Sequence, residues 1–263
     1  MSNSSPFRGL GGIPNLFTLL NLVFGCLAII FILQTGQSIV YVDAEGYTIR
    51  DLPEKITWGS ICIFAAALVD FLDGFIARLF KASSAMGKQL DSLADVVSFG
   101  VAPGMIMYQL LRLSYAGEEG GLDTSMVMLV PALIIPCAAA WRLAKFNIDE
   151  SQQVSFKGVP TPAIGLVIAS LPLIIFYQQM NLQELLLNSW LLYAIILVLG
   201  FLMISNLPML SLKIKKLSGK DNVPLYLLAV ITIAAAVILK WVAVPVVLLA
   251  YVLVSLLFKN KTA

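Results

Sequence analysis

Eight long apolar runs constrain this chain more than any other feature of its sequence. A helix needs about 20 apolar residues to cross a bilayer core of about 30 Å. Runs of roughly that length cover residues 15–34, 57–79, 89–112, 126–145, 162–180, 188–210, 223–240 and 242–258. Charged residues make up only 12% of the chain, against about 25% in an average soluble domain. The chain is therefore predicted to be an all-α, polytopic integral membrane helical bundle.

The last two runs can be interpreted in two ways, because only Lys240 and Trp241 separate them and Pro245 follows closely. They form either a tight helical hairpin or one interrupted segment. We expect residues 1–212 to be the membrane core and residues 213–263 to be a C-terminal transmembrane hairpin.

Two local features predict departures from straight membrane helices. Residues 35–55 are polar enough for a small extramembrane loop or hairpin between the first two runs. Pro103, Pro131 and Pro136 lie inside apolar runs. Each predicts a kink, because proline lacks the N–H that a helix interior needs and frees a carbonyl that a neighbouring group must bind.

The basic residues give the chain an orientation, because Lys and Arg accumulate on the cytoplasmic side of membrane proteins. With both termini inside, thirteen of the seventeen Lys and Arg residues lie on that side, and the exceptions are Arg50, Lys55, Arg112 and Lys240. We therefore expect a multi-pass protein of the cell (inner) membrane with a cytoplasmic site. The net charge of +2 is too small to indicate a nucleic-acid partner.

The second run ends in a helix face that carries two acids. At about 100° per residue, Asp70 and Asp73 share this face with Gly74, Ala77 and Arg78. The small residues leave a slot beside the acids, and Arg78 is placed to point at whatever fills it.

The third run begins with a second face of the same kind, because Gly87, Asp91 and Asp95 step by four residues. A short loop joins the two faces, so we expect them to oppose one another. Four neighbouring carboxylates repel unless cations neutralise them, and hard divalent ions prefer such oxygen ligands. The predicted cofactors are two divalent cations, Mg²⁺ or Mn²⁺, held by all four aspartates.

Metals, an arginine and a narrow slot together favour a phosphate or diphosphate ligand. Mg²⁺ usually completes its coordination with substrate phosphates, and Arg matches phosphate with a fork of donors. The chain has no histidine, so a general base must be a carboxylate, a lysine, a tyrosine or a cysteine.

Paired acids in membrane helices also mark ion pathways, which makes a divalent-cation transporter the alternative from another class. A transport path needs ionisable groups near the middle of the bilayer with access to both sides. These aspartates cluster at one end of their runs, and this placement favours an enzyme.

The complete pattern resembles the signature of the CDP-alcohol phosphotransferase family. It is Asp70-x2-Asp73-Gly74-x2-Ala77-Arg78-x8-Gly87-x3-Asp91-x3-Asp95, without a gap or substitution. The resemblance implies a membrane enzyme with six core helices, commonly a homodimer, that transfers a phosphatidyl or similar group from a CDP-linked donor to an alcohol and releases CMP. It also implies that the four acids hold two metals and that Asp95 is in addition the catalytic proton acceptor. The seventh and eighth runs are extra to that core.

Residues 142–163, RLAKFNIDESQQVSFKGVPTPA, are similar to a segment of bacterial phosphatidylserine synthases, with Lys145 and Val159 as mild departures. Residues 98–104 are also similar to that subfamily. The resemblance implies CDP-diacylglycerol as the lipid donor and L-serine as the acceptor. The alternative is a sibling enzyme that uses glycerol 3-phosphate or an inositol phosphate. Such acceptors carry a phosphate and would need more basic residues in their binding pocket.

Substrate-binding residues are expected on both sides of the acids. The candidates for binding CDP-diacylglycerol are Asn15, Thr18, Gly74, Ala77, Arg78, Ser84 and Gly87. Serine carries a carboxylate and an ammonium group, and the candidates for binding it are Arg142, Lys145, Asn147 and Lys157.

Overall fold

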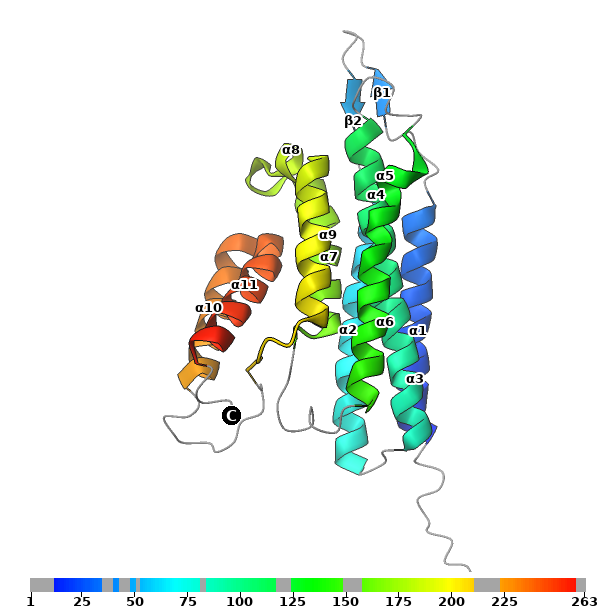
Figure 1. Cartoon of the computed structure of the whole chain (residues 1–263), viewed down its shortest axis with the longest axis vertical. Helices are drawn as coiled ribbons and strands as arrows, with labels where there is room; N and C mark the ends of the chain where they lie inside the picture. Colours follow the sequence, from blue (N-terminus) through cyan, green and yellow to red (C-terminus); the bar gives the residue numbers. More distant parts are fainter. Residues whose placement is uncertain are drawn as a thin grey trace, which may run out of the picture.

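The computed structural model describes residues 12–34, 40–42, 48–50, 53–80, 84–116, 124–148, 158–210 and 223–258. In these ranges the chain is almost entirely helical, and its long helices run side by side (Figure 1). The prediction of an all-α, polytopic membrane bundle is confirmed. The expected division at residue 212 lies outside the described residues.

The first four apolar runs form the larger part of the bundle. Their elements are α1 (Gly12–Leu33), α2 (Glu54–Phe80), α3 (Ala85–Val96), η1 (Val97–Val101), α4 (Ala102–Ala116), α5 (Met126–Leu129), η3 (Val130–Leu133) and α6 (Ile134–Ile148). The third pass is continuous through α3, η1 and α4, and the fourth through α5, η3 and α6.

The remaining runs form shorter helices. Their elements are α7 (Thr161–Phe176), η5 (Gln179–Asn181), α8 (Gln183–Leu186), α9 (Ser189–Ile204), α10 (Val223–Leu239), η7 (Lys240–Val242) and α11 (Ala243–Leu257). Within the described residues, five apolar segments are long enough to span a membrane, and the last of them, Val223–Leu257, combines α10 and α11. Helices α7 and α9 have 16 residues each, which corresponds to about 24 Å.

Helices α10 and α11 form a hairpin. They contact one another along their length and lie side by side at one edge of the bundle (Figure 1). Lys240 has a φ of 50°, and this left-handed residue reverses the chain where a continuous helix would need φ near −60°. The described residues therefore form a helical hairpin here, and that this hairpin is transmembrane stays a prediction.

The polar stretch between the first two passes contains a small hairpin, as predicted. Strands β1 (Val40–Val42) and β2 (Thr48–Arg50) pair antiparallel, with Tyr41 opposite Ile49. Figure 1 shows this hairpin at the end of the bundle opposite the junction of α2 and α3.

The regular α-helix is interrupted next to prolines in two passes, and the predicted kinks themselves stay predictions. Pro131 lies in the 3₁₀ turn η3, which interrupts the fourth pass, and Pro136 follows in the first turn of α6. Before Pro103, η1 is a π-helix in which the N–H of Ala102 donates to the carbonyl of Val97. This wider turn moves the preceding carbonyls away from the proline ring. Pro172, inside α7, is a further interior proline that the predictions did not single out.

The third pass lies at the centre of the bundle because small residues let its neighbours approach. A Cβ atom on Gly25 of α1 would lie 2.3 Å from the Ser98 Oγ and 2.9 Å from the Ser98 Cα. On the other side, a Cβ atom on Gly100 would lie 2.8 Å from the Ala139 Cβ of α6. Phe99, between these contacts, is fully buried.

We predict that Gly25→Ala destabilises the protein, because its methyl group would overlap a backbone atom of η1 as well as a side chain. Overpacking of this kind typically costs about 1–3 kcal/mol, so the thermal unfolding midpoint in detergent should fall by several degrees. Gly74→Ala is the matched control, since a Cβ there meets nothing within 4 Å. Equal midpoints for the two variants would contradict the close packing of α1 on η1.

Candidate active site

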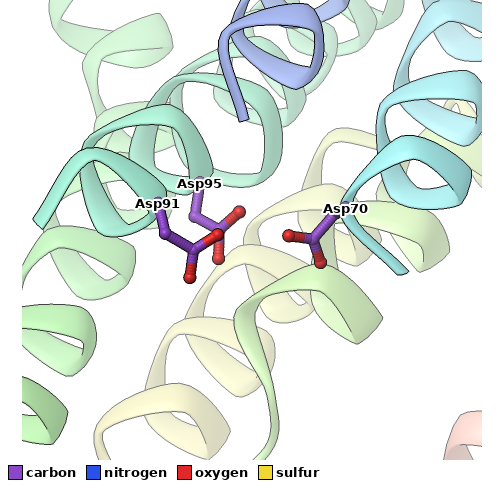
Figure 2. Close-up of side chains that lie close together, drawn as sticks. All are labelled: Asp70, Asp91 and Asp95. Carbon is purple, nitrogen blue, oxygen red and sulfur yellow. The ribbon is translucent and has the colours of Figure 1, made fainter. Parts of the chain in front are cut away.

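Three carboxylates converge where the end of α2 meets α3. One ligand oxygen from each of Asp70, Asp91 and Asp95 lies within 4.8 Å of the other two. Figure 2 shows Asp91 and Asp95 side by side on one helix, with Asp70 facing them from the other. The spacing of four residues puts Asp91 and Asp95 on one face of α3, and the packing of α2 supplies the third acid. The predicted opposition of two acidic faces is present.

The chemistry of this three-carboxylate cluster fits a divalent cation. Asp95 is buried, Asp70 and Asp91 are partly buried, and the Asp70 and Asp91 carboxyl groups lie within hydrogen-bonding reach of each other. Three such groups repel strongly when all are ionised and little water screens them. Carboxylate oxygens are the ligands that Mg²⁺ and Mn²⁺ prefer, so a bound cation would remove the repulsion.

Asp73 lies beside the three-carboxylate cluster but not in it. Its side chain is 6% exposed and accepts a hydrogen bond from the Thr18 hydroxyl of α1. It is still near enough to Asp70 and Asp91 to interact with them electrostatically. That Asp73 is a metal ligand therefore stays a prediction.

Helix α1 presents a polar stripe to both acidic helices. Thr18 contacts Asp73 of α2, and one turn later the Asn21 amide donates to the Asp95 Oδ1 of α3 at 3.2 Å. One turn earlier, Asn15 packs against α3, where a Cβ on Gly87 would lie 3.0 Å from the Asn15 Oδ1. Asn15 and Thr18 were predicted to be site residues, whereas Asn21 was not. Its position, three residues after Thr18 in an otherwise apolar helix, is the signal that could have found it.

The π-helix η1 holds Asn21 in place. The Ser98 hydroxyl donates to the Asn21 carbonyl at 3.0 Å, and both side chains are fully buried. Ser98 follows Asp95 by three residues. The continuous pass of α3 and η1 therefore carries both Asp95 and the serine that binds Asn21, the residue whose amide donates to Asp95. Such π-turns occur often at functional sites.

The predicted donor-side residues have mixed surroundings. Gly74 borders open space, as a substrate slot requires, and Arg78 is exposed near the end of α2. Ser84 is the N-cap of α3, and its hydroxyl accepts from the Gly87 N–H at 2.9 Å. That Ser84 contacts the donor phosphates stays a prediction. The side chain of Ala77 lies outside the described part of the structure.

On the acceptor side, Arg142 and Asn147 of α6 face the acidic helices. Arg142 interacts electrostatically with Asp95, and its Nη1 donates to the Thr161 hydroxyl at 3.4 Å. The Asn147 amide donates to the Ser92 hydroxyl of α3 at 2.8 Å. Two polar atoms, the Arg142 Nε and the Asn147 Oδ1, are buried without a hydrogen-bond partner. A buried donor and a buried acceptor therefore remain available for a ligand.

The two predicted lysines differ in what the structure shows of them. The Lys145 ammonium donates to the Asn206 Oδ1 at 2.8 Å, so this charge already has a polar partner. Lys157 lies outside the described residues. Lys88, which the sequence analysis did not select, donates to the Asn147 carbonyl at 3.4 Å and so links α3 to the end of α6.

Comparison with known proteins agrees with this geometry. The model of the CDP-alcohol phosphatidyltransferase family matches residues 12–202. A CDP-diacylglycerol–serine O-phosphatidyltransferase of Helicobacter pylori is 32% identical over 231 residues, which cover 86% of this chain and 81% of that protein. Proteins with the same name from Mycobacterium leprae and Bacillus subtilis are 29% and 34% identical, over 84% and 60% of this chain and 72% and 74% of theirs. The chain therefore belongs to the CDP-alcohol phosphatidyltransferase family and is a transferase.

Proposed function

We propose that this protein transfers the phosphatidyl group of CDP-diacylglycerol to the hydroxyl of L-serine, giving phosphatidylserine and CMP. The observation that carries the proposal is the three-carboxylate cluster with Arg142 and Asn147 beside it. The names of the relatives support serine as the acceptor. The substrates also agree with the position of the cluster at one end of the bundle, because the acyl chains of the donor stay in the bilayer while serine arrives from water.

Asp70, Asp73, Asp91 and Asp95 would together hold two divalent cations, Mg²⁺ or Mn²⁺. When bound, such ions polarise a diphosphate and stabilise the negative charge that develops on the departing CMP. The proposal draws support from the mutual distances of three of these carboxylates and from the electrostatic proximity of Asp73.

Asp95 has the surroundings that a general base needs. A serine hydroxyl is a poor nucleophile at neutral pH, so a base must take its proton as the oxygen attacks phosphorus. In this step a bond forms from the serine oxygen to phosphorus, the bond from phosphorus to CMP breaks, and the proton passes to Asp95. The Asn21 amide donates to Oδ1 and orients the carboxylate, which leaves Oδ2 for the acceptor.

Donor and acceptor would bind on different elements. The donor would lie along Gly74, Ala77, Arg78, Gly87, Ser84 and the α1 residues Asn15 and Thr18. The serine carboxylate would bind to Arg142, whose Nε is buried without a partner, and the ammonium group to the Asn147 Oδ1. Lys145 and Lys157 are the remaining candidates. An acceptor that carries a phosphate would need more positive charge, and Lys145 already binds Asn206.

Three further features complete the proposal. The site would face the cytoplasm, because basic residues surround it. Arg78 and Lys88 lie on the acidic helices α2 and α3, and Arg142 and Lys145 lie on α6, which packs against α3. The membrane would be the cell (inner) membrane. The working unit would be a homodimer, as the family resemblance implies.

An acceptor panel tests the proposed substrate. Purified protein in mixed micelles with CDP-diacylglycerol should form a labelled lipid from radiolabelled L-serine. It should form none above background from glycerol 3-phosphate or an inositol phosphate. In the described part of the acceptor side, Lys145 already donates to Asn206, so Arg142 is the cation left for a phosphate. A labelled lipid from either phosphate, with none from serine, would overturn the assignment.

Asp95 and Asp73 should respond differently to the same substitution. Asp95→Asn should slow CMP release at least about a hundredfold at every metal concentration, because an amide cannot take the serine proton and general-base steps contribute about 10²–10⁴-fold. Asp73→Asn should be partly restored by high metal, because only a ligand charge is lost.

The measurement is the rate of CMP release across a Mg²⁺ titration for both variants and the wild-type protein. If high metal restores Asp95→Asn as fully as Asp73→Asn, then Asp95 is a ligand and not the base.

A further inference from the structure

The C-terminal hairpin lies beyond the residues that the family model matches, yet it contacts the core beside the acceptor side. The match ends at residue 202, whereas α11 covers Ala243–Leu257 and packs against α7. Most of the hairpin surface is apolar and faces outward. Two polar side chains of α11 are buried instead, namely Tyr251 at 9% exposure and Ser255 at 0%. Buried polar groups in a membrane helix need partners.

Both side chains bind the backbone of a single residue, Leu210. The Tyr251 hydroxyl donates to the Leu210 carbonyl at 3.0 Å, and the Leu210 N–H donates to the Ser255 Oγ at 3.0 Å. The Ser255 hydroxyl in turn donates to the Tyr251 carbonyl at 2.7 Å. Leu210 lies outside any helix, so α11 supplies the partners that a helix would otherwise give its backbone.

The stretch that ends at Leu210 is bound on its other side by residues next to the acceptor. The Asn206 Oδ1 accepts from Lys145 at 2.8 Å, and the Leu207 carbonyl accepts from the Gly158 N–H at 2.8 Å. Gly158 has a φ of +73°, and a Cβ there would lie 2.8 Å from the Ser205 carbonyl oxygen. Residues 205–210, which we term the 205–210 segment, are therefore held between α11 on one side and Lys145 of α6 and Gly158 on the other.

Tyr251 also borders the acceptor side directly. Its phenol is close enough to Arg142 for the two groups to interact electrostatically. Arg142 in turn donates to Thr161, the first residue of α7. Helix α11 thus interacts electrostatically with one proposed serine-binding residue, Arg142, through Tyr251. It is linked to a second, Lys145, through the 205–210 segment.

We infer that α11 positions the serine-binding residues, and that Tyr251 is the positioning residue through which it does so. The inference rests on the proposed function. Tyr251 does not need to touch serine. Its hydroxyl binds Leu210 and so holds the 205–210 segment, whose Asn206 binds Lys145. Its phenol also interacts electrostatically with Arg142. The acids and the donor-side residues belong to α1, α2 and α3, so loss of the hydroxyl should leave donor binding intact.

Tyr251→Phe, with Tyr226→Phe as the matched control, tests this division. Tyr226 lies on α10 with 53% of its surface exposed. Tyr251→Phe should raise the KM for serine about three- to tenfold, because this is the range that follows from losing one buried hydrogen bond. It should change the KM for CDP-diacylglycerol by less than about twofold. Tyr226→Phe should change neither KM.

Ser255→Ala provides a second variant in case Tyr251→Phe does not fold. It removes the acceptor for the Leu210 N–H, so it should raise the KM for serine in the same way. Because both residues bind Leu210, their effects should not be independent. The double variant should raise the KM for serine by less than the product of the two single-variant increases.

The outcomes separate this inference from the proposed function. An unchanged serine KM in an active, folded Tyr251→Phe or Ser255→Ala protein would overturn the inference, as would equal increases in both KM values. A wild-type protein that releases no CMP in response to serine would overturn the proposed function, and the inference would fall with it.

Discussion

Carboxylates buried between membrane helices are the constraint on which the rest of this structure depends. Removing a carboxylate from water without a partner costs several kcal/mol, and Asp70, Asp91 and Asp95 bring three together. Neutral donors such as Asn21 and a single guanidinium, Arg142, offset part of that cost. A bound divalent cation would offset the remainder. In the proposed function, the same cation would also bind the phosphate groups of the lipid donor.

The bundle is built to keep this arrangement rigid. Gly25 lets α1 approach the π-helix η1 closely enough for Ser98 to bind the Asn21 carbonyl. Asn21 then orients Asp95, and Thr18 on the same face of α1 binds Asp73. Both acidic helices are therefore hydrogen-bonded to α1. Arg142 and Asn147, the proposed acceptor residues, interact with α3 from α6. Distances between reacting groups depend on such supports, because small misplacements slow an enzyme substantially.

Local patterns account for what the sequence could predict. The apolar runs predicted the all-α membrane bundle, although only five segments of the described residues are long enough to span a membrane. The four-residue spacing placed Asp91 and Asp95 on one face. The Lys240 turn was left open between two interpretations, because a reversal there depends on how α10 packs against α11. The roles of Asn21 and Tyr251 were missed for the same physical reason. Their partners, Asp95 and Leu210, are 74 and 41 residues away in the chain, and only the packing of distant helices brings them together.

The metal dependence of CMP release tests the central claim, that the acids hold divalent cations needed for turnover, most directly. Purified protein would be treated with a chelator, freed of it, and assayed with CDP-diacylglycerol and serine as Mg²⁺ or Mn²⁺ is added back. The account predicts no CMP release before addition and recovery of the rate with either ion, because the carboxylates then regain their counter-charges. Full turnover by the chelator-treated protein without added metal would contradict it.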